Sequence, residues 1–506
     1  MNNAFKPLGL AAAVAAASVG VNAQTVNSSE VGDLALVPYY TVNGDWVTGV
    51  HIVNTSAKTQ VVKFRFRRAS DSLDALDFSI VMSPKDVYAG FLNDADGTIK
   101  WSADVDTTCT VPVATSGALE MPSIYNPNGE SATGYIEIIA MGAPTSETMP
   151  IALGAKHKDG TPLDCAAVRS NFFANGVVGT ARGVVDNATS YQVGPTTKGS
   201  EALTGTNEYE DSGDVLKVSY FIRDNATGIE FGDNAVHIAG FLTQPAVTNQ
   251  EFGWLSGDLD GFDFPDLDGG PPTATTPERG RFDALRGVLG TANLSNEWST
   301  NPANGVAVDW VVTLPGQYTM MDTPEYVVDE LDDNDASKCV RDVCDYRDIP
   351  VTATISIWDR EEAVPAQDAP IPGDLVVSPN IPGTPDAPVV TQLTQEVNVV
   401  TFGGGSVLGV SDVTISDPGV AAPFGWMSLS VTSATGTQSV CDWDATEDTA
   451  GGPRVTDAKL RALMGNTCTP VTNSGVPMIG FAAWARSVAA NPDASYGRII
   501  EHSFTS

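Results

Sequence analysis

The chain has 506 residues, of which 27 are Lys or Arg and 62 are Asp or Glu, so its formal net charge is −35. This charge argues against a nucleic-acid-binding protein, because phosphate contacts require clustered positive charge. Hydrophobic residues make up 42% of the chain and charged residues 18%, which suits a large core and not a disordered polyampholyte. The 48 Gly and 32 Pro residues, with abundant Val and Thr, break long helices and favour short strands. We therefore expect an all-β fold.

The first 23 residues have the pattern of a secretory signal peptide. One cation precedes an apolar run over residues 8–21, and Val21-Asn22-Ala23 forms a small-residue cleavage site. The apolar run is too short to span a bilayer, and no later stretch approaches the roughly 20 uninterrupted apolar residues of a membrane helix. We therefore predict an exported protein that matures at Gln24, has no transmembrane segment, and is secreted to the extracellular cell surface.

Strand patterns dominate the rest of the chain. Apolar runs over residues 34–40 and 46–53 flank Asn43-Gly44, which is the strongest short signal for a β-hairpin. Further strands are expected over residues 61–67, 134–141, 215–223, 235–242, 306–314 and 351–358. Helical patterns are few and short, over residues 72–76, 281–289 and 456–464. These patterns predict β-sandwich-like sheets with long loops and few short helices.

The strand over residues 61–67 alternates strictly between apolar and basic residues. The alternation places Val62, Phe64 and Phe66 on one face and Lys63, Arg65 and Arg67 on the other. Because successive side chains of a strand point to opposite sides, we expect the apolar face to pack in the core.

Two stretches have the composition of connections. Residues 363–388 hold seven prolines and form a Pro-rich linker, and residues 251–275 form an acidic loop rich in Gly and Asp. After the signal peptide at 1–23, these stretches separate an N-terminal β region at 24–250, a central β region at 276–362 and a C-terminal β region at 389–506. Strands from different regions can still share one sandwich.

Six cysteines, an even number, suit disulfide bonds in an oxidising compartment. Nearest-neighbour pairing would join Cys109 with Cys165, Cys339 with Cys344, and Cys441 with Cys468, but six cysteines allow 15 connectivities. A zinc site is disfavoured, because Cys339 and Cys344 are separated by four intervening residues and have no histidine nearby.

The strongest chemical signal in the sequence is a set of oxygen ligands for a hard cation. Its members are Asp258, Asp260, Asp263, Asp266 and Asp268, which alternate with Gly and apolar residues. A loop of this kind can turn several carboxylates toward one Ca2+ ion, which takes 6 to 8 oxygens. The spacing does not match an EF-hand, and a solvated acidic loop is the alternative. We predict a structural calcium site here and solvated surfaces at the acidic clusters over residues 93–96, 329–335 and 442–448.

Catalytic motifs are largely missing. The chain has four histidines, at positions 51, 157, 237 and 502, and it contains no HExxH, GxSxG or P-loop motif. A Ser-His-Asp triad leaves no sequence signature, because its members meet only in space. We assign no catalytic and no cofactor-binding residues, and we do not expect an enzyme.

Several phrases of the sequence carry a resemblance to a known family. They are Val37-Pro38-Tyr39-Tyr40, Val50-His51-Ile52-Val53-Asn54-Thr55-Ser56, Phe66-Arg67, Ser72-Leu73-Asp74-Ala75-Leu76-Asp77-Phe78, Ser83-Pro84-Lys85-Asp86-Val87, Asp309-Trp310-Val311-Val312-Thr313-Leu314-Pro315, Trp358-Asp359-Arg360-Glu361-Glu362 and Val476-Pro477-Met478-Ile479-Gly480-Phe481. Together they resemble exported proteobacterial proteins that include the surface-layer (S-layer) proteins of marine gammaproteobacteria. The resemblance implies a β-rich subunit of a two-dimensional lattice on the outer membrane, with calcium as the lattice ion and no enzymatic motif.

The composition agrees with such a lattice. Strongly acidic subunits repel one another, and Ca2+ that bridges carboxylates across an interface converts this repulsion into attraction. We therefore predict a secreted S-layer structural protein that self-assembles in a calcium-dependent way, with copies of itself and the outer-membrane surface or lipopolysaccharide as partners.

Two other functions remain as alternatives. A secreted adhesin or carbohydrate-binding biofilm-matrix protein could use some of the 9 Trp and 12 Tyr residues as stacking platforms. However, Trp46, Trp298, Trp310 and Trp358 lie in or beside strand patterns, where core packing is expected. A secreted hydrolase would need a cleft that contains titratable groups with perturbed pKa values.

Overall fold

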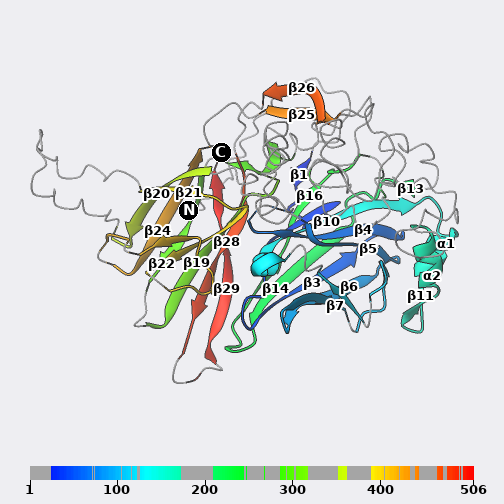
Figure 1. The fold of residues 1–506 in the computed structure, drawn as a ribbon, viewed down its shortest axis with the longest axis horizontal. Coiled ribbons are helices and arrows are strands. Elements are labelled where there is room, and N and C mark those ends of the chain that lie inside the picture. Colours follow the sequence, from blue (N-terminus) through cyan, green and yellow to red (C-terminus); the bar gives the residue numbers. More distant parts are fainter. Residues whose placement is uncertain are drawn as a thin grey trace, which may run out of the picture.

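The structure is a computed structural model of the chain. It describes residues 24–70, 72, 74–103, 105–114, 117–121, 126–172, 209–243, 245, 247, 267, 285, 287–291, 293–300, 304–316, 351–361, 389–403, 405–416, 418–420, 422–432, 439–443, 464–470, 476–488, 491 and 494–505. Most of these residues form β-strands, which build two sandwiches that lie side by side (Figure 1). The all-β prediction is therefore confirmed.

The N-terminal sandwich consists of two antiparallel sheets. Sheet 1 has the strand order β1 (Thr25–Val26), β16 (Val236–Ala239), β2 (Leu34–Thr41), β10 (Thr133–Pro144), β4 (Gln60–Arg68), β5 (Asp74–Met82) and β8 (Cys109–Val111), with β13 (Tyr209–Glu210) also paired to β10. Sheet 2 has the order β15 (Glu230–Asn234), β14 (Leu216–Asp224), β3 (Trp46–Asn54), β6 (Val87–Ala95), β7 (Thr98–Ser102) and β9 (Ala118–Glu120).

The C-terminal sandwich also has two sheets. Sheet 3 has the order β21 (Val389–Leu393), β20 (Val351–Asp359), β24 (Phe424–Thr432), β18 (Asn293–Ser299) and β30 (Ser503–Thr505). Sheet 4 has the order β23 (Val413–Ile415), β22 (Val397–Phe402), β19 (Val306–Thr313), β28 (Ile479–Arg486) and β29 (Tyr496–Glu501), and only its β22–β23 pair is parallel among the described pairings. Strands of the central and C-terminal β regions thus share both sheets.

Short elements complete the described fold. They are the 3-10 helix η2 (Pro127–Ala132), the helices α1 (Pro150–Ala155) and α2 (Cys165–Ser170), and the strand pairs β11 (His157–Lys158) with β12 (Thr161–Pro162), β17 (Gly290–Thr291) with β27 (Val476–Pro477), and β25 (Ser439–Trp443) with β26 (Met464–Pro470). No helix in the described part of the chain is long and apolar enough to cross a membrane.

Aromatic rings from both sheets fill the N-terminal core. Phe64 on β4 packs against Phe66, Phe78 and Trp101, with ring centroids 4.9 to 5.0 Å apart. The Trp101 indole N–H donates to the hydroxyl of Tyr88 at 2.8 Å, so the polar end of the buried indole is satisfied. The prediction that the apolar face of the strand over residues 61–67 packs in the core is confirmed.

The predicted hairpin at Asn43-Gly44 is wrong. β2 pairs with β10 and β16 in sheet 1, whereas β3 pairs with β14 and β6 in sheet 2. The chain does form a tight turn here: Gly44 has a positive φ of 60°, and the Trp46 N–H donates to the Asn43 carbonyl at 3.2 Å. It carries the chain from sheet 1 across to sheet 2. Side chains of both strands are then buried in the same core between the two sheets.

The helix expected over residues 72–76 is also wrong. The structure places Ser72 at a φ of 57°, and β5 begins at Asp74 and pairs with β4. Leu76, Phe78 and Ile80 alternate along β5 and are buried in the core. The period of two along β5 outweighs the short helical pattern over residues 72–76, which overlaps the start of the strand.

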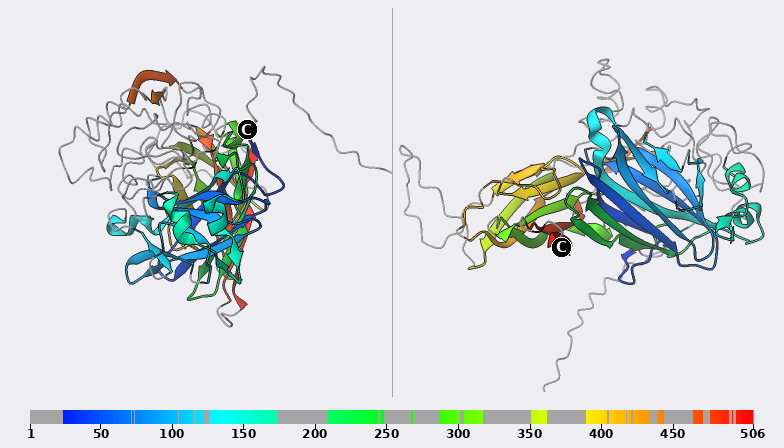
Figure 2. Two further views of the ribbon diagram at one scale, coloured as in Figure 1. Left: turned by 90° about the vertical axis from the view of Figure 1, so that its right-hand side faces the viewer. Right: turned by 90° about the horizontal axis from the view of Figure 1, so that it is seen from below.

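The two sandwiches share a continuous hydrophobic core. Val311, Val397 and Phe481 from sheet 4 belong to the same buried cluster as the N-terminal core residues. Backbone groups also meet at the junction, where the Val397 N–H donates to the Ala69 carbonyl at 3.0 Å. The view from below in Figure 2 shows that the sandwiches adjoin each other along one side. The described fold is therefore one connected body.

Candidate functional site

The predicted calcium loop lies outside the described residues. This is true of Asp258, Asp260, Asp263, Asp266 and Asp268, of the cluster over residues 329–335, and of Cys339 and Cys344. Within the described part of the chain, no group of three or more His, Cys, Asp or Glu residues has the arrangement of a metal site. The calcium site therefore stays a prediction.

One predicted disulfide is confirmed. Cys109 on β8 is bonded to Cys165 on α2, so the helix is tied to the edge strand of sheet 1. The register of β25 and β26 places Cys441 opposite Cys468, but their disulfide stays a prediction.

The acidic residues at 93–96 serve a turn. A carboxylate oxygen of Asp94 accepts a hydrogen bond from the Gly97 N–H at 2.8 Å, and Asp96 has a positive φ of 56°. Such a contact is the ordinary way in which Asp stabilises a tight turn, so these carboxylates do not indicate a ligand.

His157 meets a serine and an aspartate, as a catalytic histidine would. Its Nδ1 lies 3.2 Å from the Ser83 hydroxyl and 3.6 Å from an Asp86 carboxylate oxygen, and its Nε2 lies 3.3 Å from the Thr107 hydroxyl. In a Ser-His-Asp triad, the serine and the aspartate contact opposite ring nitrogens. Here both contact Nδ1, and the Thr107 hydroxyl donates to the Gly160 carbonyl at 2.9 Å. The arrangement holds β11 and β12 against the turn before β6 and does not activate a nucleophile.

Two other histidines are buried and structural. Nε2 of His237 accepts a hydrogen bond from the Val218 N–H at 2.8 Å, and burial lowers the pKa of His237 to about 4. Nε2 of His502 donates to the Val311 carbonyl at 3.0 Å, and burial lowers the pKa of His502 to about 4 as well. Both imidazoles are therefore neutral near pH 7.

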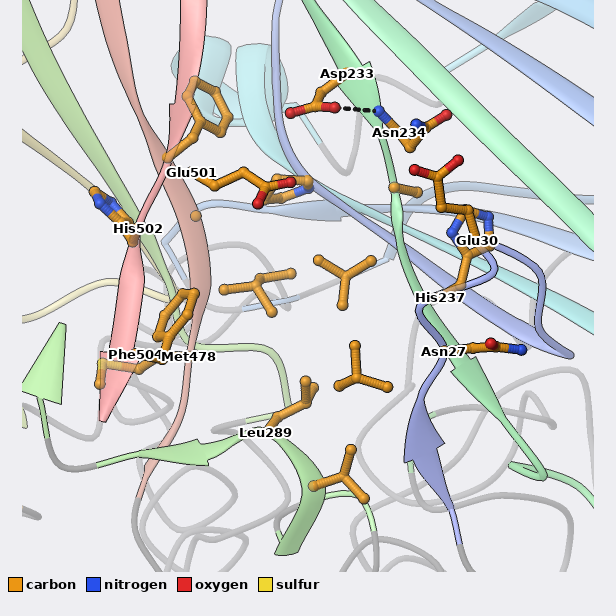
Figure 3. Close-up of a pocket in the computed structure, with 18 of the residues that line it drawn as sticks. Asn27, Glu30, Asp233, Asn234, His237, Leu289, Met478, Glu501, His502 and Phe504 are labelled. Atoms are coloured by element: carbon orange, nitrogen blue, oxygen red, sulfur yellow. Dashed lines mark hydrogen bonds between the residues drawn. The ribbon is translucent and has the colours of Figure 1, made fainter. Parts of the chain in front are cut away.

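The principal candidate site is a cavity of about 650 Å³ at the junction of the two sandwiches (Figure 3). Strands β1 and β14–β16 line it from the N-terminal sandwich, strands β28–β30 line it from the C-terminal sandwich, and the short strand β17 contributes Gly290 and Thr291. In Figure 3, the carboxylates of Glu30, Asp233 and Glu501 gather in the upper half, whereas Leu289 and Met478 lie in the lower half. The cavity thus has an acidic end and an apolar end.

Two cross-strand pairs form the acidic end of the cavity. Tyr220 on β14 is registered with Asp233 on β15, and Phe481 on β28 is registered with Glu501 on β29. Residues directly opposite on neighbouring strands project to the same side of the sheet. The Tyr220 and Phe481 ring centroids lie 6.4 Å apart, so the two pairs face each other across the junction. Each pair contributes an aromatic ring and a carboxylate.

The outer face of sheet 3 is a second candidate site. Three rows of registered residues cross β20, β24 and β18, namely Trp358-Trp426-Glu297, Ser356-Ser428-Ser295 and Thr354-Ser430-Asn293. Trp426 is 45% exposed, and Trp358 is half-buried beside it. The expectation that Trp358 packs in the core is therefore wrong, because its position on β20 is out of phase with the buried Ile355 and Ile357. The same expectation is confirmed for Trp46, Trp298 and Trp310.

The sequence reasoning missed both candidate sites. Asp233 and Glu501 are single acids in ordinary strand patterns, and only the junction brings them together. The face of sheet 3 leaves a weak signal, the alternation of Thr, Ser and Trp along residues 352–358. Comparisons of the chain with protein-family models, with curated proteins and with solved structures give no match.

Proposed function

We propose that this protein is an exported structural subunit that assembles with copies of itself into a calcium-dependent S-layer lattice on the cell surface. The observation that carries the proposal is the continuous core of the two sandwiches, which makes the described fold one body. A lattice repeats one contact geometry over many copies, so its subunit needs a fixed shape.

Contacts at the junction support a fixed shape. The Thr313 hydroxyl on β19 donates to the Pro38 carbonyl on β2 at 2.5 Å, and the Val397 N–H on β22 donates to the Ala69 carbonyl of the N-terminal sandwich at 3.0 Å. Thr313 and Val397 are both buried. A polar group buried without its partner costs free energy, so these contacts favour one relative placement of the sandwiches.

The charge of the chain supports the role of calcium. A net charge of −35 makes like subunits repel one another at low salt. Monovalent salt only screens this repulsion, whereas Ca2+ can bind carboxylates of two subunits at once. The proposed calcium ligands include Asp258, Asp260, Asp263, Asp266 and Asp268.

Electron microscopy of the purified mature protein tests this proposal. The protein is dialysed from a chelator into CaCl2, or into NaCl at the same ionic strength, and the products are examined by negative staining. We expect ordered sheets with Ca2+ and dispersed particles with Na+. Equal assembly in both salts would mean that screening alone drives association, and dispersed particles in both would contradict the lattice.

A glycan-binding surface protein is a second candidate, favoured by the outer face of sheet 3. Trp358 and Trp426 are cross-strand neighbours beside rows of Ser and Thr hydroxyls. Exposed aromatic rings can stack on sugar rings while hydroxyls bond to sugar oxygens. Affinity electrophoresis in gels that contain cell-surface polysaccharide tests this, with Trp426→Ala as the variant and Trp484→Ala on β28 as the control. Equal retardation of the wild type and Trp426→Ala would exclude this face.

A further inference from the structure

The cavity between the sandwiches holds two carboxylates that no cation of the described residues neutralises. Asp233 and Glu501 form no ion pair with any Lys, Arg or His in the described part of the chain, whereas Glu30 is paired with Lys217 at 2.8 Å. His237 and His502 line the same cavity and are neutral. The acidic end therefore carries two carboxylates, of which Asp233 is partly buried and Glu501 is exposed to solvent.

A buried hydroxyl lies beside these carboxylates. Tyr220 is only 5% exposed, and its hydroxyl has no hydrogen-bond partner in the described part of the chain. Tyr220 lines the cavity, and burial, together with the charges of Asp233 and Glu501, raises its pKa well above the ordinary value. Because Tyr220 lines the cavity and a phenol oxygen can accept a hydrogen bond, this oxygen is open to a donor that enters the cavity.

We propose that this cavity binds an organic ammonium ion carried on a hydrocarbon chain. The ammonium lies between Asp233 and Glu501, donates to the Tyr220 oxygen, and contacts the rings of Tyr220 and Phe481. A primary ammonium has three donors and no acceptor, which matches two carboxylates and one phenol oxygen. Aromatic faces attract a cation as well.

The rest of the cavity fits the hydrocarbon part of such a ligand. Leu289 and Met478 line the end away from the carboxylates, Val288 is a further apolar residue of the lining, and ligand sites of this kind typically enclose about 300 to 1,000 Å³. A calcium ion is a poorer occupant, because Ca2+ takes about 6 to 8 oxygens and the described lining has no metal-site arrangement. An anion would be repelled by both carboxylates. The inference is independent of the lattice proposed above.

The first test uses three probes of the same length on the unassembled wild-type protein in chelator. Isothermal titration calorimetry compares hexylammonium, hexanol and hexanoate. We expect hexylammonium to bind at least about tenfold more tightly than hexanol, and hexanoate to show no binding. Equal affinities for hexylammonium and hexanol would overturn the proposal, because the cavity would then be only apolar. Absence of hexylammonium binding at millimolar concentration would overturn it as well.

The second test assigns the binding to the named residues. We expect Asp233→Asn and Glu501→Gln each to weaken hexylammonium about tenfold, and Tyr220→Phe about threefold. Glu120→Gln, an exposed carboxylate that pairs with Lys100 on β7, is the matched control and should leave the affinity unchanged. Circular dichroism confirms that each variant is folded. Wild-type affinity in the Asp233→Asn/Glu501→Gln double variant would place the ammonium elsewhere and overturn the assignment.

Discussion

The polar faces of sheet 1 and sheet 3 look alike as sequence patterns but have opposite environments. On β4, Lys63, Arg65 and Arg67 alternate with core residues, and all three are completely buried. On β20, Thr354 and Ser356 alternate with core residues in the same way, and both are partly open to solvent. Alternation therefore identifies the face that packs in the core, but it does not show whether the opposite face meets water.

The buried face of sheet 1 is a ladder of paired charges. The register places Glu137, Arg65 and Asp77 side by side on β10, β4 and β5. Arg65 lies 3.2 Å from Glu137 and 3.4 Å from Asp77, and Lys63 lies 2.7 Å from Asp77. Arg67 lies 3.0 Å from Glu137. Each of these three buried cations thus has a carboxylate on a neighbouring strand, which offsets the cost of burying its charge.

The outer face of sheet 3 has no such ladder. Its central rows consist of Ser and Thr hydroxyls, and its described ion pair, Glu297 with Arg498 at 3.4 Å, is about half exposed. Hydroxyls can exchange hydrogen bonds with water at little cost, whereas guanidinium and carboxylate groups buried away from water cannot. Mutations on the two faces should therefore differ sharply in their effect on stability.

The largest effect is expected from Asp77→Asn, which removes a carboxylate from the buried ladder. Lys63 and Arg65 would both lose a charged partner, so the free energy of unfolding should fall by about 3 to 5 kcal/mol. Urea unfolding measures the change. The control is Glu120→Gln in an exposed ion pair, which should cost less than about 1 kcal/mol. A loss below about 1 kcal/mol for Asp77→Asn would show that the ladder contributes no more than a surface pair.

The next effect is expected from the disulfide beside the same face of sheet 1. The Cys109–Cys165 bond closes a sequence separation of 56 residues and holds α2 over Val61 and Val81. Replacing both cysteines by Ser should lower the free energy of unfolding by about 3 to 4 kcal/mol, because the unfolded chain gains entropy. Urea unfolding under non-reducing conditions measures this. Unchanged stability would mean that the helix docks without its covalent link.

A pH effect should distinguish a buried carboxylate without a cation from the paired ones. Asp309 in sheet 4 accepts hydrogen bonds from the Ser406 hydroxyl and from the Val407 and Leu408 N–H groups at 2.7 to 2.8 Å. Burial raises the pKa of Asp309 to about 7. The folded state therefore holds this proton more tightly than the unfolded chain, so its contribution to stability falls as the pH rises from about 4 to about 7.

The variant Asp309→Asn isolates this contribution. Relative to the variant, the wild type should lose on the order of 3 kcal/mol of unfolding free energy between pH 4 and pH 7. Urea unfolding at several pH values gives the two profiles, and their difference removes the effect of all other groups. Parallel profiles would contradict the raised pKa.

The smallest effect is expected on the outer face of sheet 3. The hydroxyls of Ser356 and Ser428 are cross-strand neighbours and partly solvated, so the double change to Ala should alter the unfolding free energy by less than about 0.5 kcal/mol. The same urea assay measures it. A loss near that of Asp77→Asn would remove the contrast between the two faces.

The sequence by itself determined the local features of this protein. The strands over residues 34–40, 46–53 and 61–67 were predictable, because two apolar runs and, over residues 61–67, a period of two in hydrophobicity are written in the chain itself. The bond between Cys109 and Cys165 agreed with the simplest nearest-neighbour pairing. The apolar side of the strand over residues 61–67 could be named in the same way, since it depends only on alternation.

Only the tertiary structure decided how these strands meet. The Asn43-Gly44 signal does not specify whether the two flanking strands pair in one sheet or pack face to face in two sheets. The structure has the second arrangement, with β2 in sheet 1 and β3 in sheet 2. The burial of Arg65 depends on partners supplied by β5 and β10. Asp233 and Glu501 share a cavity because edge strands of two sandwiches meet there. The physical reason is the same in each case: strand pairing and sheet packing join residues that are far apart in the chain, and no local pattern encodes that choice.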